Sequence, residues 1–112
     1  MDTSAITDDF MNQMLAASKE YTIVLLKAGP VQDKDDLRQI VWEHGRRNFA
    51  LRSAGLVSIV CPITDGGPLK GIAIFNTGVQ ETKQIMEGDP GVKEGIFVYE
   101  VHTGRSFPGD HL

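Results

Sequence analysis

Residues 21–28, Tyr-Thr-Ile-Val-Leu-Leu-Lys-Ala, decide the fold, and Gly29 and Pro30 close this stretch. Its side chains are apolar or β-branched at successive positions, without the alternation of a strand that has one face in water. The stretch therefore predicts a strand covered on both faces. Residues 96–103, Ile-Phe-Val-Tyr-Glu-Val-His-Thr, have the same character near the other end of the chain. Both faces of the sheet that contains these strands must therefore be covered by other parts of the protein.

After the first strand the spacing of the apolar residues changes to that of a helix, which predicts the principal helix. Between residues 35 and 54 apolar side chains recur at helical spacing, and Gly55 follows as a left-handed terminator. The residues on this stripe are Leu37, Ile40, Val41, His44 and Leu51. Trp42, Arg46 and Phe49 lie off the stripe and form a second surface, which the N-terminal helix or another subunit would cover.

Two shorter strands and a short helix complete the domain. Residues 56–61 and 70–76 predict strands joined as a hairpin through the turn Asp-Gly-Gly-Pro at 65–68. Thr77 and Gln80 match a capping box, which predicts the start of a short helix that stops before residue 88.

The order of elements from residue 21 onward is strand, helix, strand, strand, helix, strand. This is the split βαβ pattern of a ferredoxin-like α+β fold with an antiparallel sheet. Two helices cover only one face of such a sheet, so we expect a second copy of the sheet to cover the other face in a homodimer. A monomer whose N-terminal helix covers that face is the alternative.

The chain divides into three parts. Residues 1–20 predict a helical extension, residues 21–104 the ferredoxin-like domain, and residues 105–112 a polar tail. The extension holds a predicted helix over residues 4–18, and its apolar stripe consists of Phe10, Met11, Met14 and Leu15.

Composition narrows the class of protein. The 112 residues include 11 Lys and Arg against 15 Asp and Glu, a net charge of −4, which argues against nucleic acids and anionic membranes as partners. No apolar run approaches the roughly 20 residues of a membrane span, and the first residues lack the basic region of a secretory signal. The single cysteine, Cys61, cannot form an internal disulfide. These features predict a cytoplasmic protein.

His44 and Asp89 are the candidate catalytic residues. His44 lies on the apolar stripe, so its imidazole faces the sheet, where a histidine can act as a general base near neutral pH. Asp89 precedes Pro90, which fixes the direction of the aspartate at the exit of the second helix. Both helices cover the same sheet face, so their ends can bring the two side chains together. The alternatives are a core histidine bonded to a backbone carbonyl and a turn aspartate bonded to local amides.

Other reactive residues fit no site. Cys61 ends a strand and is expected to be an inert small hydrophobe rather than a nucleophile. The histidines His102 and His111 do not have metal-ligand spacing, even with Asp110. Gly66 suits a hairpin and belongs to no nucleotide-binding loop. The sequence thus implies neither a metal nor a cofactor.

Several short motifs resemble the YCII-related family over residues 21–103. They are a histidine within the first helix, Leu-Arg-Ser-Ala-Gly at 51–55, Cys-Pro at 61–62 with Asp-Gly at 65–66, Gly71, Asp-Pro at 89–90, Gly-Ile-Phe at 95–97 and Tyr-Glu-Val at 99–101. The resemblance implies a ferredoxin-like domain that dimerises as an α/β barrel, with a His–Asp pair, here His44 and Asp89, in a small cleft. Two positions depart from the family pattern: Cys61 stands where glycine is common, and Gly91 stands where an aromatic residue is common. The missing aromatic is expected to widen the pocket or to remove a contact with the substrate.

These observations predict a small, cofactor-independent enzyme. His44 would transfer a proton and Asp89 would orient it, in a lyase or isomerase reaction on a compact cyclic or phenolic metabolite. The alternative is a non-catalytic dimeric module that binds a small ligand or a protein. A monooxygenase of the dimeric α/β-barrel group is a further alternative, which rests on fold alone.

Overall fold

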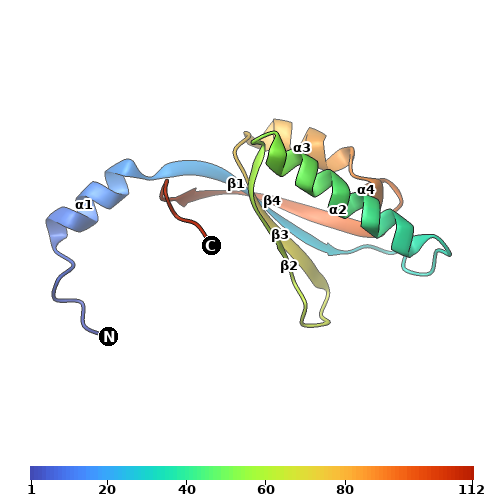
Figure 1. The fold of residues 1–112 in the computed structure, drawn as a ribbon, viewed down its shortest axis with the longest axis horizontal. Helices are drawn as coiled ribbons and strands as arrows, with labels where there is room; N and C mark the ends of the chain where they lie inside the picture. The colour runs from blue at the N-terminus through green and yellow to red at the C-terminus, as the bar shows by residue number, and fades with distance from the viewer.

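The structure, a computed structural model, describes residues 1–112 as a mixed α+β protein with one four-stranded antiparallel sheet (Figure 1). The strand order is β2-β3-β1-β4. In chain order the elements are α1 (Asp8–Ala17), β1 (Lys19–Ala28), α2 (Leu37–Ser53), β2 (Val57–Pro62), β3 (Leu69–Phe75), α3 (Val79–Glu87), α4 (Pro90–Lys93) and β4 (Phe97–Ser106). No helix is long and apolar enough to cross a bilayer.

Helices α2, α3 and α4 lie together on one face of the sheet (Figure 1). The core between them and the strands is small, because only 12 of 112 residues are buried. Its apolar members are Val24, Leu26, Val57, Phe75, Met86, Ile96 and Phe97. Partly buried apolar residues such as Leu37, Ile40 and Tyr99 pack around it.

The second face of the sheet is open. Along β1 the residues Thr22, Val24 and Leu26 are buried, whereas Ile23 and Leu25 between them are half-buried. The register pairs Ile23 with Ile74 of β3 and Leu25 with Ile72, which places these side chains on the face opposite the helices. Helix α1 projects beyond the end of the sheet and does not cover this face (Figure 1). The alternative of a monomer closed by its own N-terminal helix is therefore wrong.

The expectation that the strand at residues 96–103 is apolar on both faces is wrong for β4. Its outward positions include Glu100 and His102, both exposed, and Glu100 forms an ion pair with Lys27 of β1. The open face is thus apolar along β1, β3 and β2 and charged along β4. We refer to the apolar part, formed by Ile23, Leu25, Ile59, Ile72 and Ile74, as the open sheet face.

Several element ends differ from the sequence prediction. The capping box is absent: Gly78 is the N-cap of α3, and the Thr77 hydroxyl instead contacts that of Thr82 at 2.7 Å. The loop after α3 contains the short helix α4, which the sequence pattern does not predict. Pairing of Lys19 with Ser106 extends β1 and β4 beyond the predicted domain limits at residues 21 and 104. Gly55, with φ of 77°, terminates α2 as predicted.

Candidate functional site

The side chains of His44 and Asp89 meet, as the sequence predicted. The distance from His44 Nδ1 to Asp89 Oδ1 is 2.7 Å, although the residues are 45 positions apart. The His44 side chain is 13% exposed and that of Asp89 is 2% exposed. The imidazole is therefore near the surface, and the carboxylate beneath it is sealed from water.

Helix α4 explains why a carboxylate is tolerated at this depth. Asp89 is the N-cap of α4, and its Oδ2 accepts hydrogen bonds from the backbone N–H groups of Gly91 at 2.9 Å and Val92 at 3.1 Å. Pro90 occupies the first helical position, where no backbone N–H is needed. Together with the imidazole, these donors satisfy both carboxylate oxygens. Asp89 is thus more than a turn residue: it holds α4 and His44 at once.

The hydrogen bonds of His44 assign its tautomer. A carboxylate only accepts hydrogen bonds, so Nδ1 carries a proton that it donates to Asp89. In the neutral ring Nε2 then has a free electron pair. The side-chain amide of Asn48 lies 3.2 Å from Nε2 and donates to it. His44 is consequently bonded through side chains on both nitrogens, which differs from a core histidine held by a backbone carbonyl.

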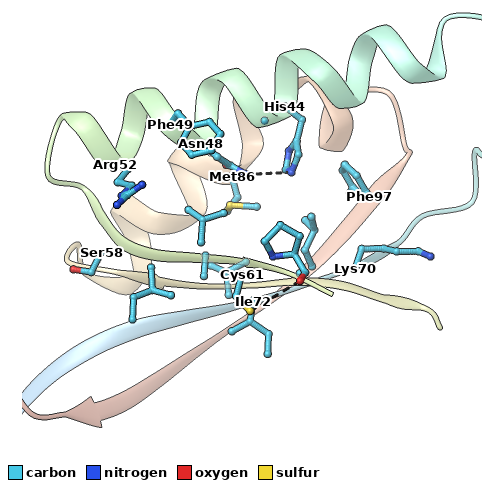
Figure 2. A pocket seen from close by; sticks show the side chains of 18 of the residues that line it. His44, Asn48, Phe49, Arg52, Ser58, Cys61, Lys70, Ile72, Met86 and Phe97 are labelled. Atoms are coloured by element: carbon cyan, nitrogen blue, oxygen red, sulfur yellow. Dashed lines mark hydrogen bonds between the residues drawn. The ribbon is translucent and has the colours of Figure 1, made fainter. Parts of the chain in front are cut away.

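Asn48 is a site residue that the sequence analysis missed. It follows His44 by four positions, so the two side chains project from the same face of α2. The signal was that spacing, together with the polarity of Asn48 on an otherwise apolar side of the helix. Figure 2 shows Asn48 and His44 side by side under α2.

A cavity of about 390 Å³ lies between α2 and the sheet and opens beside His44 (Figure 2). Its walls are mainly apolar, and they include Val24, Leu26, Phe49, Val60, Met86 and Phe97. His44, Asn48 and Arg52 follow each other at successive turns of α2 and form a polar strip along that helix, and Ser58 and Lys70 add polar groups from the strands. Figure 2 shows Arg52 pointing from α2 toward the sheet. The cavity therefore combines an apolar chamber with a polar strip along one helix.

Gly91 does not widen the pocket, contrary to expectation. It is buried and is not among the residues that line the cavity. A Cβ atom at this position would overlap the ring of Phe97 and would lie 3.1 Å from Asp89 Oδ2. Phe97 of β4 thus fills the space beside Gly91, and its ring also packs on His44, with 4.7 Å between the ring centroids. An aromatic ring supports the imidazole, but it comes from another strand.

The other reactive residues lie outside the His–Asp pair. Cys61 is exposed, not buried as expected of a strand end, and its pairing with Ile72 places its side chain toward the open sheet face. His102 contacts Glu100 at 3.1 Å, and His111 contacts only the adjacent chain end.

Two groups on β4 have displaced pKa values. Burial raises the pKa of the Tyr99 hydroxyl, and so does its hydrogen bond to Glu87 at 3.0 Å. Hydrogen bonds from Lys27 and His102 lower the pKa of Glu100 at the charged edge of the open side. Both groups lie away from the cavity, so they do not take part in the chemistry of His44.

No family model matches the chain and no curated protein is significantly similar to it.

Proposed function

We propose that this protein is a small enzyme in which His44 is the general base and Asp89 orients it. The observation that carries the proposal is the paired imidazole at the wall of a cavity, with its Nδ1 proton held by a buried carboxylate. An imidazole fixed in this tautomer presents Nε2 as the acceptor for a substrate proton. The carboxylate stabilises the imidazolium formed after transfer.

The reaction class that fits is proton abstraction from carbon or oxygen followed by elimination or isomerisation. Nε2 of His44 takes the proton, and the electron pair of the broken bond stays on the substrate. In an elimination the pair forms a double bond, and the leaving group departs with its own bonding pair and takes the proton from the imidazolium. In an isomerisation the double bond shifts, and the imidazolium returns the proton to another atom. Asn48, which donates to Nε2 in the free protein, would turn to a substrate oxygen when the substrate enters.

A compact cyclic or phenolic metabolite fits the cavity. Its volume of about 390 Å³ is within the usual range for small-molecule sites of about 300–1,000 Å³. Val60, Met86 and Phe97 favour a flat apolar body, whereas Asn48 and Arg52 favour an oxygen substituent at one edge. No residue of this scheme requires a cofactor for proton transfer.

We further propose, from the sequence motifs at residues 51–55, 61–62 and 89–90, that the chain is a YCII-related protein with a ferredoxin-like topology. The strand order β2-β3-β1-β4 and the antiparallel pairing of all neighbours fit that topology. The open sheet face fits a homodimer in which two sheets pack together as an α/β barrel. Such a dimer would bury side chains such as Leu25 and Ile72, which the protomer leaves half-buried.

Ile72→Glu is expected to raise the dissociation constant of the homodimer, because it places a charge in the centre of the open sheet face. Sedimentation velocity measures the change. Lys83→Glu, at an exposed position of α3 on the helical side, is the control and should remain dimeric. Wild-type protein that sediments as a monomer at high concentration, or an unchanged dimer of the Ile72→Glu variant, contradicts assembly through this face.

The functional proposal is tested by a thermal-shift screen with small phenolic and lactone compounds. A ligand at 100 times its Kd stabilises the folded protein by about 2.7 kcal/mol, which raises the Tm by several degrees. We expect bound compounds to lose this shift in the His44→Ala variant and to keep it in His102→Ala, which alters an exposed histidine. Turnover of the bound compounds is then followed by their ultraviolet spectra. If every compound binds His44→Ala as well as wild type, the assignment of the site fails.

One observation favours a non-catalytic ligand-binding module as the second candidate. The amide of Asn48 already occupies the electron pair of His44 Nε2, so the pair satisfies itself without a substrate. In a binding module, His44→Gln would change stability and ligand affinity, and no compound would be converted. Any substrate consumed by wild type but not by His44→Gln excludes this candidate.

A further inference from the structure

The outer side of α2 carries an exposed apolar groove. Trp42 is 67% exposed and Phe49 is 66% exposed, values far above those of a packed helix surface. Val41 and Gly45 lie between them, and Gly45 leaves open space where a side chain would stand. We refer to the depression formed by Leu37, Arg38, Val41, Trp42, Gly45, Arg46 and Phe49 as the α2 groove. An apolar depression of this kind on a helix is typical of a surface that receives another helix.

Helix α1 has an apolar face with no partner in its own chain. Phe10, Met11 and Leu15 are 44%, 47% and 48% exposed, and no residue of α1 is buried. A 10-residue helix is marginal in water when it stands alone, so packing of its apolar face has to stabilise it. The Thr7 side chain caps its first turn by accepting from the backbone N–H of Phe10.

The α1 helix cannot reach the α2 groove of its own protomer. Only Ser18 separates α1 from β1, and Lys19 is already paired with Ser106 of β4. This short link fixes α1 beyond the end of the sheet, away from α2 (Figure 1). The radius of gyration is 16.8 Å, whereas a compact chain of this length has about 13 Å. Helix α1 is thus placed where its apolar face can contact only a partner outside its own protomer.

The charges of the two surfaces are complementary. The first turn of α1 carries Asp8 and Asp9, and α1 has no basic residue. The α2 groove is flanked by Arg38 and Arg46. Opposite charges at the rim of an apolar contact favour association of the two surfaces.

We propose that α1 of a second copy of this chain docks in the α2 groove. The exchanged helix would place Phe10, Met14 and Leu15 against Val41, Trp42 and Phe49. Val41, Gly45 and Phe49 line both the groove and the His44 cavity. The partner's α1 therefore also supplies part of the cavity rim, so the site is completed by the second copy. This proposal concerns assembly and holds whether or not His44 catalyses a reaction.

The fluorescence of Trp42 tests the contact directly, because Trp42 is the one tryptophan of the chain. Docking buries its indole and shifts the emission maximum to shorter wavelength. We expect wild-type protein to show this blue shift and the variant Phe10→Ser/Leu15→Ser to lose it. The substituted side chains are exposed in the protomer, so the domain from β1 to β4 should stay folded, and any loss of helical circular dichroism should not exceed the 10 residues of α1. The control Asn12→Ser, also on α1, should keep the blue shift.

Complementation distinguishes a second copy from docking within one chain. Trp42→Ala protein, which has an intact α1 and is silent in tryptophan emission, is refolded from denaturant together with the Phe10→Ser/Leu15→Ser variant. The blue shift of the variant's Trp42 should return in the mixture. The proposal is overturned by wild-type emission typical of exposed indole, by a blue shift that survives in the α1 variant, or by a mixture that behaves as the variant alone.

Discussion

Asp89→Asn is expected to abolish the activity while leaving the fold nearly intact. The asparagine oxygen can still accept from the backbone N–H groups of Gly91 and Val92, as asparagine does well at N-caps. Its amide group, however, then faces His44 Nδ1 as a donor. The imidazole must move its proton to Nε2, which removes the base. Where an aspartate fixes a histidine in this way, the same change reduces turnover by about 10⁴-fold.

The tautomer of His44 can be measured without a substrate. In the ¹⁵N NMR spectrum of the neutral imidazole, wild-type protein should have the proton on Nδ1 and Asp89→Asn should have it on Nε2. If Nδ1 keeps its proton in the asparagine variant, the orienting role of Asp89 is refuted.

Asp89→Ala separates the two roles of the carboxylate. This variant loses the cap of α4 at about 0.5–2 kcal/mol and leaves the imidazole N–H without its partner at about 1–3 kcal/mol. We expect the free energy of unfolding to fall by about 3 kcal/mol, well beyond the loss in Asp89→Asn. Urea unfolding of both variants gives the comparison, and equal losses would mean that Asp89 does not cap α4 in solution.

Phe97→Ala is expected to lower the free energy of unfolding by about 3–5 kcal/mol, the usual cost of removing a buried aromatic side chain. Phe97 is 9% exposed, belongs to the core and packs on the His44 ring. Its removal enlarges the cavity and frees the imidazole to rotate. Phe97→Leu keeps an apolar side chain at the position and should recover most of the loss. A decrease below about 1 kcal/mol for the alanine variant would contradict this packing.

Gly91 provides an independent check on the position of the Phe97 ring. In the wild-type background Gly91→Ala forces its methyl group into that ring, and over-packing of this kind costs about 1–3 kcal/mol. In the Phe97→Leu background the smaller side chain leaves more room, so the same change should cost less. A double-mutant cycle measures the difference, and additive losses would show that the two side chains do not touch.

The elements that the sequence predicted are those with a local physical signal. The run at residues 21–28 and the helical spacing of Leu37, Ile40 and Leu51 each repeat over several residues, so they marked β1 and α2. Gly55 marked the end of α2, because the backbone there requires a positive φ. The contact between His44 and Asp89 followed from topology, since both helices had to share one sheet face.

The features that the sequence did not predict depend on tertiary contacts. The hydroxyl of Thr77 met that of Thr82, so the expected capping box did not form. Helix α4 is only four residues long and shows no helical period. Phe97 occupies the space beside Gly91 from a distant strand, which no local pattern records. A pattern of apolar residues also does not show whether the space they surround is packed with side chains or left as a cavity, such as the one beside His44.

The Asp89 carboxylate binds both the backbone of α4 and the imidazole of His44. Local opening of the α4 backbone therefore also affects the orientation of the imidazole. The amide protons of Gly91 and Val92 are protected from solvent exchange only while the carboxylate holds them. The carboxylate binds these amides through Oδ2 and His44 through Oδ1, so fraying of that turn also breaks the contact with His44. Deuterium uptake at these two amides therefore measures the fraction of time for which Asp89 holds the imidazole, and the measurement needs no substrate.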